Sequence, residues 1–176
     1  MIRKILRSGD PRLREISKPV TKIDSKILKL IRDLKETLAI QKNPEGVGLA
    51  APQIGKRLRI FVANYKELNR IVINPEILKS KSPITNYQSP KSRQEILEGC
   101  LSLSNYYAPL KRINLVKIKY LNEEGKEVTE EFKGFNAQIV LHEIDHLNGI
   151  LFLDRLLEQK QPLYKLGKDK WEEVEL

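Results

Sequence analysis

The chain's only two histidines lie four residues apart, in the stretch His142-Glu143-Ile144-Asp145-His146. If this stretch is helical, residues four apart stack on one face, so both imidazoles can reach the same point. Glu143 would project about 100° round the helix from His142, close to that point without sharing it. This pattern is typical of a catalytic metal site in which the histidines hold a divalent ion and the glutamate transfers protons. The alternative is a surface helix with two solvated histidines.

A catalytic metal site usually has three protein ligands and one open position. The chain has no third histidine. One class of metalloprotease places it ten residues after the first, and Phe152 stands there. A second class uses a downstream carboxylate, for which Glu158, Glu172 and Glu173 are available. A metallopeptidase of this second class is therefore an alternative that the sequence leaves open.

The chain's one cysteine, Cys100, is the other candidate for the third ligand. A thiolate binds borderline divalent ions well, and Gly99 before it allows a close approach of the backbone. A free cysteine is more often a small buried hydrophobic residue, and Cys100 taken alone favours that interpretation. A lone cysteine cannot form an internal disulfide, which agrees with a reducing compartment.

A first helix is expected from the capping residues Asp24 and Ser25 to about Ile40. Its apolar residues recur every three or four positions, which gives the helix one face to bury. They are Ile27, Leu30, Ile31, Leu34 and Leu38.

A second helix is expected to carry the histidine pair. Asn136 is the candidate cap at its start, and the helix would end near Leu147, with Asn148 and Gly149 as the stop signal.

The rest of the chain indicates short strands joined by loops. Residues 46–55 read GVGLAAPQIG, whose three glycines and one proline predict a loop with small side chains. Two runs, 59–65 and 71–78, are rich in β-forming residues, and residues 113–133 are typical of a hairpin with its turn at 122–125.

Three other segments are less regular. Residues 1–23 contain Pro11 and Pro19 and should lack a long helix, and the polar residues 79–96 should form an exposed excursion. The charged stretch 156–176 is not expected to be a single helix. The resulting fold class is α+β, with small antiparallel sheets packed around a central helix that carries the HEIDH motif, and residues 1–176 should form a single catalytic domain.

Composition limits the broad class of the protein. Of 176 residues, 40% are hydrophobic and 31% are charged, which is typical of a soluble globular protein. No apolar run is long enough to span a bilayer, so no membrane association is expected, and residues 1–17 lack the apolar stretch of a secretory signal. The net charge of +9 leaves a third alternative, a basic module that binds RNA or the ribosome.

Three motifs taken together are more specific than HEIDH alone. GVGLAAPQIG, EGCLSL (98–103) and HEIDHLNG (142–149), in this order, resemble the signature motifs of the peptide deformylases. The resemblance covers most of residues 4–155. Two positions depart from the common pattern of that family, because Ser104 stands where a proline is usual and Leu141 where a glutamine is usual.

The resemblance implies a metal-dependent hydrolase that removes the N-formyl group from the N-terminal formylmethionine of newly made proteins and releases formate. It implies one divalent ion, Fe²⁺ in the native enzyme, with Zn²⁺ or another divalent ion able to replace it. The implied metal ligands are Cys100, His142 and His146. Glu143 would be the general acid and base, and the backbone N–H of Leu101 and the side-chain amide of Gln53 would stabilise the negative charge on oxygen.

The implied substrates are N-formylmethionyl peptides and nascent chains, bound in an extended form by strand-like pairing. Gly48 is the expected backbone donor. Val47, Phe135 and Ile139 are expected to line an apolar pocket for the methionine, although packing in the core is the alternative for all three. The resemblance also suggests that Glu98 pairs with Arg112 and so holds the loop that carries the cysteine.

The resemblance implies a bacterial cytoplasmic enzyme, or an organellar one from which a transit peptide has been removed. A weak contact with the polyanionic ribosome through the basic surface is a further expectation. Residues 159–170, with four lysines and one aspartate, are the best local candidate for it. Alternatively, that tail packs against the rest of the chain through Leu163, Leu166 and Trp171.

Overall fold

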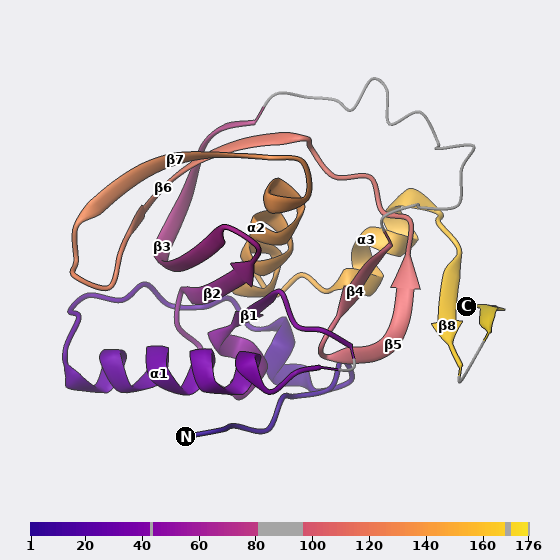
Figure 1. The fold of residues 1–176 in the computed structure, drawn as a ribbon, viewed down its shortest axis with the longest axis horizontal. Coiled ribbons are helices and arrows are strands. Elements are labelled where there is room, and N and C mark those ends of the chain that lie inside the picture. The colour runs from indigo at the N-terminus through magenta and orange to yellow at the C-terminus, as the bar shows by residue number, and fades with distance from the viewer. Residues whose placement is uncertain (43, 81–96, 168–169, 176) are drawn as a thin grey trace.

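A computed structural model describes residues 1–42, 44–80, 97–167 and 170–175, and it has the expected α+β architecture (Figure 1). A five-stranded antiparallel sheet has the strand order β1-β2-β3-β6-β7, and a four-stranded antiparallel sheet has the order β4-β5-β8-β9. The strands are β1 Gly48–Ala50, β2 Ile60–Tyr65, β3 Leu68–Ser80, β4 Glu98–Cys100, β5 Leu103–Ala108, β6 Leu115–Leu121, β7 Glu127–Lys133, β8 Leu163–Leu166 and β9 Trp171–Val174.

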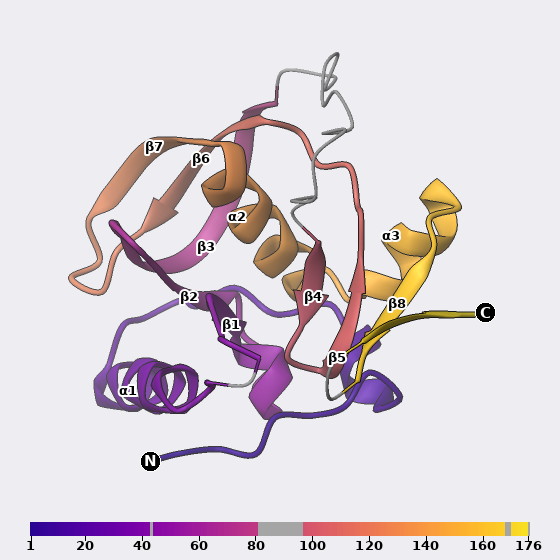
Figure 2. The ribbon, with the colours of Figure 1, turned by 45° about the vertical axis from the view of Figure 1, so that its right-hand side comes forward.

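Three α-helices and two short 3₁₀ helices accompany the sheets in the described part of the chain. They are α1 Ser25–Ala39, α2 Gly134–Leu147, α3 Phe152–Gln159, η1 Pro11–Arg14 and η2 Ala51–Ile54. The helix α2 lies between the curved five-stranded sheet and β4, as both views show (Figures 1 and 2). Ten of its 14 residues are buried, which places the histidine pair in the interior.

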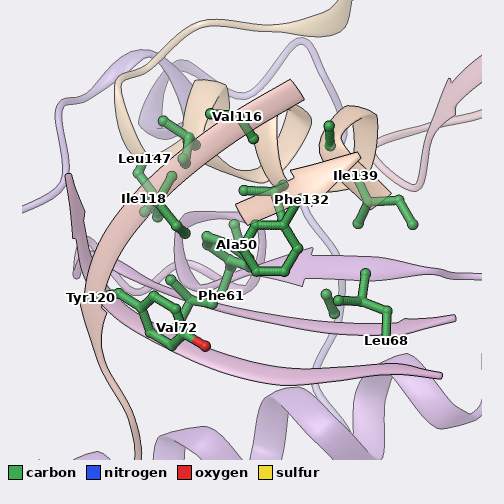
Figure 3. Packing of buried hydrophobic residues seen from close by; sticks show 14 residues of the cluster. Ala50, Phe61, Leu68, Val72, Val116, Ile118, Tyr120, Phe132, Ile139 and Leu147 are labelled. Atoms are coloured by element: carbon green, nitrogen blue, oxygen red, sulfur yellow. The ribbon is translucent and has the colours of Figure 1, made fainter. Parts of the chain in front are cut away.

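The five-stranded sheet is covered on both faces. Along β2, Ile60 and Val62 pack into the cluster that contains the apolar face of α1. The alternate residues Phe61 and Ala63 pack into the cluster that contains α2 and the hairpin β6–β7 (Figure 3). Burial of each large apolar side chain stabilises the fold by roughly 1.5–3 kcal/mol. Because both faces are buried, the first four residues of β2, Ile60 to Ala63, are all apolar.

The predicted first helix is confirmed as α1. The Asp24 carboxylate accepts hydrogen bonds from the backbone N–H groups of Lys26 and Ile27, at 2.9 and 3.0 Å. It thereby satisfies two donors that have no partner within the helix. Leu34 and Leu38 of the predicted stripe are buried against the five-stranded sheet.

The predicted start of the second helix is wrong. Asn136 lies inside α2, which begins two residues earlier at Gly134. The chain leaves β7 at Lys133, and Gly134 has a positive φ of 58° that turns it directly into the helix. The left-handed backbone of Gly134 therefore starts the helix, and no side chain caps it. The predicted stop is confirmed, because Gly149 has a φ of 72° just beyond the end of α2.

The expectation that residues 46–55 form only a loop is wrong as well. Residues Gly48–Ala50 form β1, which pairs with β2 in the register Gly48↔Ala63, and η2 follows directly. A strand of three residues is too short to show a period of two, so only the pairing with β2 defines it.

The runs at 59–65 and 71–78 and the hairpin at 113–133 are confirmed as β2, β3 and β6–β7. Of the predicted excursion, residues 79–80 end β3 and residues 81–96 lie outside the described part.

The prediction that the tail is not one helix is confirmed, because it contains the end of α3 and the hairpin β8–β9. Within the residues described, no helix is both long enough and apolar enough to cross a membrane.

Candidate metal centre

The structure brings Cys100, His142 and His146 together. The strand β4 carries the cysteine and α2 carries both histidines on one face, as the i, i+4 spacing predicted. One ligand atom from each residue lies within 4.8 Å of the other two, and all three residues are buried. The Sγ of Cys100 lies 3.3 Å from Nε2 of His146. No other residue in the described part offers a third ligand atom to the two histidines.

The downstream carboxylates lie elsewhere. Glu158 pairs with Arg155 in α3 at 3.0 Å. Glu172 and Glu173 are exposed residues of β9, in register with Lys165 and Tyr164. The geometry therefore favours the cysteine over a downstream glutamate as the third ligand.

Glu98 fixes the orientation of His142. One oxygen of its carboxylate lies 2.7 Å from Nδ1 of His142, so the other ring nitrogen, Nε2, is left for the metal position. Arg112 donates two hydrogen bonds to the same carboxylate, at 2.6 and 2.9 Å. The predicted Glu98–Arg112 pair is therefore confirmed, and through Glu98 it connects β4 to His142, a candidate metal ligand.

This network continues beyond the pair that the sequence predicted. Arg112 also donates to Asp145 at 2.6 Å, and Arg155 of α3 donates to Asp145 at 2.7 and 3.0 Å. Gln138 donates to Glu98 at 3.1 Å. Asp145 lies within the HEIDH motif. A charged residue on a largely apolar helix indicates that a buried partner of opposite charge is present, so the sequence contained a signal for this contact.

The donor set fits a divalent metal ion. Burial would raise the pKa of the Cys100 thiol, but the imidazoles of His146 and His142 outweigh burial and hold it well below its ordinary value. Burial would lower the pKa of His142, but the Cys100 thiolate and Glu98 raise it by more. Metal ligands bind in the deprotonated form. A bound cation would therefore take the place of the protons on the histidines and would stabilise the Cys100 thiolate instead. A thiolate and two imidazoles suit Zn²⁺ and Fe²⁺.

Glu143 is buried beside the three ligand residues. Burial raises the pKa of its carboxyl to about 7, although the nearby imidazoles lower it. Its Oε2 has no hydrogen-bond partner within the described residues. A Cβ atom added at Gly48 would lie 2.3 Å from Oε1 of Glu143, so a glycine is required where β1 passes the carboxylate. The carboxyl therefore has a pKa suited to proton transfer near neutral pH.

Gln53 is also directed towards the site. Its side chain is buried, and its Oε1 accepts a hydrogen bond from the N–H of Ala50 at 2.8 Å. The Nε2 therefore faces the site, 3.2 Å from Oγ of Ser102 and 3.7 Å from Sγ of Cys100. Leu101 follows the cysteine, so its backbone N–H lies next to the ligand residue.

Four of the residues described above, Gln53, Cys100, His142 and Glu143, line one cavity of about 330 Å³. The predicted pocket residues Val47, Gly48, Phe135 and Ile139 all line this cavity. Among the described strands, β1 and β4 are edge strands of their sheets, and both border it. The cavity thus combines an apolar wall with two strand edges and the candidate metal position.

A sequence model of the polypeptide deformylase family matches residues 2–162 of the chain. The peptide deformylase of Dictyoglomus turgidum is 42% identical over 159 residues, which cover 90% of this chain and 95% of that protein. The peptide deformylase of Pseudothermotoga lettingae is 43% identical over 154 residues, which cover 88% and 82% of the two chains. This chain belongs to the peptide deformylase family.

The structural comparison agrees. The crystal structure of the peptide deformylase from Thermotoga maritima is similar to this chain with a TM-score of 0.75 and 39% identity, over 88% of this chain and 97% of the other. The resemblance inferred from the three motifs is therefore confirmed at the level of family and fold. Members of this family are metalloenzymes, and the Cys100, His142 and His146 cluster provides for a metal ion.

Proposed function

We propose that this chain hydrolyses the formamide bond of N-formylmethionyl peptides, with one divalent ion held by Cys100, His142 and His146. The observation that carries the proposal is the convergence of these three ligand atoms within 4.8 Å, beside the buried carboxyl of Glu143. When bound, the ion would act as a Lewis acid on the formyl oxygen. Fe²⁺ is the native ion in this proposal, and Zn²⁺ or another divalent ion can replace it.

Glu143 is the general acid and base of the reaction. Its carboxylate accepts a proton from the water molecule that attacks the formyl carbon. It then donates that proton to the amine nitrogen as the C–N bond breaks, so that formate and a free N-terminal amine are released. A buried carboxyl with a pKa of about 7 can both accept and donate a proton near neutral pH.

Two donors stabilise the negative charge that develops on the formyl oxygen. One is the side-chain amide of Gln53, whose nitrogen must face the site because its oxygen is bound by the N–H of Ala50. The other is the backbone N–H of Leu101. Both belong to segments that are fixed by neighbouring contacts, so they need little reorganisation during the reaction.

The substrate binds in an extended form between the edge strands β1 and β4. Edge strands offer unpaired backbone groups to an added strand, and Gly48 is the donor that we assign on β1. The methionine side chain occupies the apolar part of the cavity, lined by Val47, Phe135 and Ile139. Residues 1–176 act as one catalytic domain in this proposal.

Formate release separates the proposal from the other two functions. The full chain, prepared without oxygen and supplied with Fe²⁺, should release one formate per molecule of formyl-Met-Ala and leave its peptide bond intact. A metallopeptidase would instead cleave the peptide bond, and a binding module without activity would do neither. Peptide cleavage without formate release would refute the proposal.

Nascent chains on bacterial ribosomes are the proposed physiological substrates, and the cytoplasm is therefore the proposed site of action. The net charge of +9 supports a weak, long-range attraction to ribosomal RNA. The tail that the sequence singled out is a poor candidate for a specific contact. Its Lys165 is in register with Glu172, and Leu163 is buried, whereas Lys168 and Asp169 lie outside the described residues.

A further inference from the structure

An aromatic pair lies beside the proposed active site. Tyr107 of β5 lines the catalytic cavity. The indole of Trp171 in β9 meets the Tyr107 ring edge to face, with centroids 5.3 Å apart and an interplanar angle of 80°. Trp171 is 51% exposed. An exposed indole that packs on a wall residue of the cavity needs an explanation beyond core packing, because the largest side chains are normally covered.

The strand register places this pair beside Gly99, the residue before the candidate metal ligand. Gly99, which precedes Cys100, is paired with Tyr107 across β4 and β5. A Cβ atom at Gly99 would lie 2.7 Å from the Tyr107 ring, so the ring lies directly over the glycine. The sequence of contacts Cys100–Gly99–Tyr107–Trp171 therefore leads from the metal site to the surface.

The same face of the sheet continues this apolar surface. Tyr107 is in register with Tyr164 of β8, and Leu166, two residues further on, shares that face and is in register with Trp171. Leu166 is partly exposed. The opposite face carries Leu163 and Val174, which pack into the core. The exposed aromatic face therefore adjoins the cavity at Tyr107, the one of its residues that lines it.

We infer that Trp171 and Tyr107 form a subsite for a large apolar or aromatic side chain of the substrate, at the third residue or beyond. This inference rests on the proposed function. An extended peptide advances roughly 3.4 Å per residue, so the third residue lies about two residues' length beyond the methionine in its pocket. An aromatic side chain there can stack on the exposed part of the indole. The protein would then prefer nascent chains that carry a large apolar or aromatic side chain at the third residue or beyond.

Kinetics on matched peptides test the subsite. The full chain should show a kcat/KM about threefold to tenfold higher for formyl-Met-Ala-Phe than for formyl-Met-Ala-Ala, from the stacking of one aromatic ring. Trp171→Ala should abolish this preference and leave formyl-Met-Ala turnover unchanged. Trp171→Phe should keep most of it. The control Leu157→Ala, which removes a 61% exposed apolar side chain from α3, should keep all of it.

A binding measurement gives a readout that is independent of turnover. Trp171 is the only tryptophan of the chain, so intrinsic tryptophan fluorescence reports on this position alone. In the full chain carrying Glu143→Gln, formyl-Met-Ala-Phe should shift the emission, whereas formyl-Met-Ala-Ala should not.

Two results would overturn the inference: equal emission changes with both peptides, or an aromatic preference that Trp171→Ala leaves intact. Failure of the unaltered chain to release formate from formyl-Met-Ala would count against the proposed function instead. In that event the fluorescence titration still decides whether Trp171 contacts the peptide.

Discussion

At the scale of single residues, the proposed chemistry depends on a few side chains with shifted pKa values. Glu143 is buried with its pKa raised to about 7, and the Cys100 thiol has its pKa held well below the ordinary value by two imidazoles. A buried carboxyl of this kind costs stability, since its desolvation is only partly compensated. Proteins keep such groups where their function depends on them.

Removing the basicity of Glu143 tests its role. Glu143→Gln keeps the shape of the side chain but cannot accept or donate the proton. We expect metal content unchanged and kcat for formyl-Met-Ala lowered by at least about 10²-fold, the lower limit for a general acid and base. Turnover and metal content measured on the same preparation provide the check. Near-normal turnover with metal bound would rule out this role for Glu143.

At the scale of elements, the ion-pair network joins β4, α2, α3 and the segment before β6. Arg112 binds Glu98 and Asp145 at once, and its side chain is only 10% exposed. Burial would lower the pKa of Arg112, but the carboxylates of Glu98 and Asp145 raise it by more than burial lowers it. The guanidinium therefore stays charged. The network therefore sets the position of His142, a proposed metal ligand, through Glu98.

Loss of Arg112 should affect both stability and the metal. Arg112→Met leaves the Glu98 carboxylate buried without its strongest partner, which should cost about 3–5 kcal/mol of unfolding free energy. The affinity for the metal should fall by roughly 10–100-fold. Urea unfolding and a metal competition titration measure the two effects.

The matched control is Arg57→Met, which removes a half-exposed guanidinium that pairs with Glu15. An exposed pair contributes at most about 1 kcal/mol, so little should change. Equal effects in the two variants would contradict a special role for Arg112.

The contacts between β3 and the hairpin β6–β7 make the free energy of unfolding depend on pH. Burial would raise the pKa of Glu130, but hydrogen bonds from Arg70, at 2.8 and 2.9 Å, and from Tyr120, at 2.8 Å, lower it below its ordinary 4.5. The folded chain therefore binds fewer protons here than the unfolded chain does. The resulting stability is present above about pH 4.5 and is lost as the pH falls through the lowered pKa.

The variant Glu130→Gln should therefore have a lower urea midpoint than the unaltered chain at pH 7, and the difference should shrink as the pH falls below about 4.5. Glu127→Gln on the same strand is the control. Its carboxylate is exposed and lies 3.8 Å from Lys119, so it should show almost no difference at either pH. A difference that stays constant between pH 7 and pH 4 would exclude this linkage.

Local signals in the sequence predicted much of the fold and of the site. Three of these signals lie within about one helical turn of sequence: the i, i+4 spacing of the histidines, the Asp24 cap and the Gly149 stop. The start of α2 and the strand β1 were missed, because a glycine turn and a three-residue pairing depend on distant partners. The contacts of Asp145 with Arg112 and of Trp171 with Tyr107 were not predicted for the same reason, because the two partners lie far apart in the sequence.

At the scale of the whole molecule, the excess of basic residues governs long-range attraction. With a net charge of +9, the chain should sediment with ribosomes at low salt and be released as salt screens the attraction. A chain that ends after Gln161 lacks three lysines of the predicted basic stretch and should bind equally well, because the charge is distributed over the molecule. Binding that persists at high salt would indicate a specific contact instead.

The metal content of Cys100→Ser tests the central claim most directly. Three ligands leave no spare, and a serine hydroxyl is a poor substitute for a thiolate. With both proteins prepared without oxygen and loaded with Fe²⁺, the unaltered chain should hold about one ion per chain and the variant close to none. One ion per chain in Cys100→Ser would contradict the assignment of Cys100, His142 and His146 as the metal site.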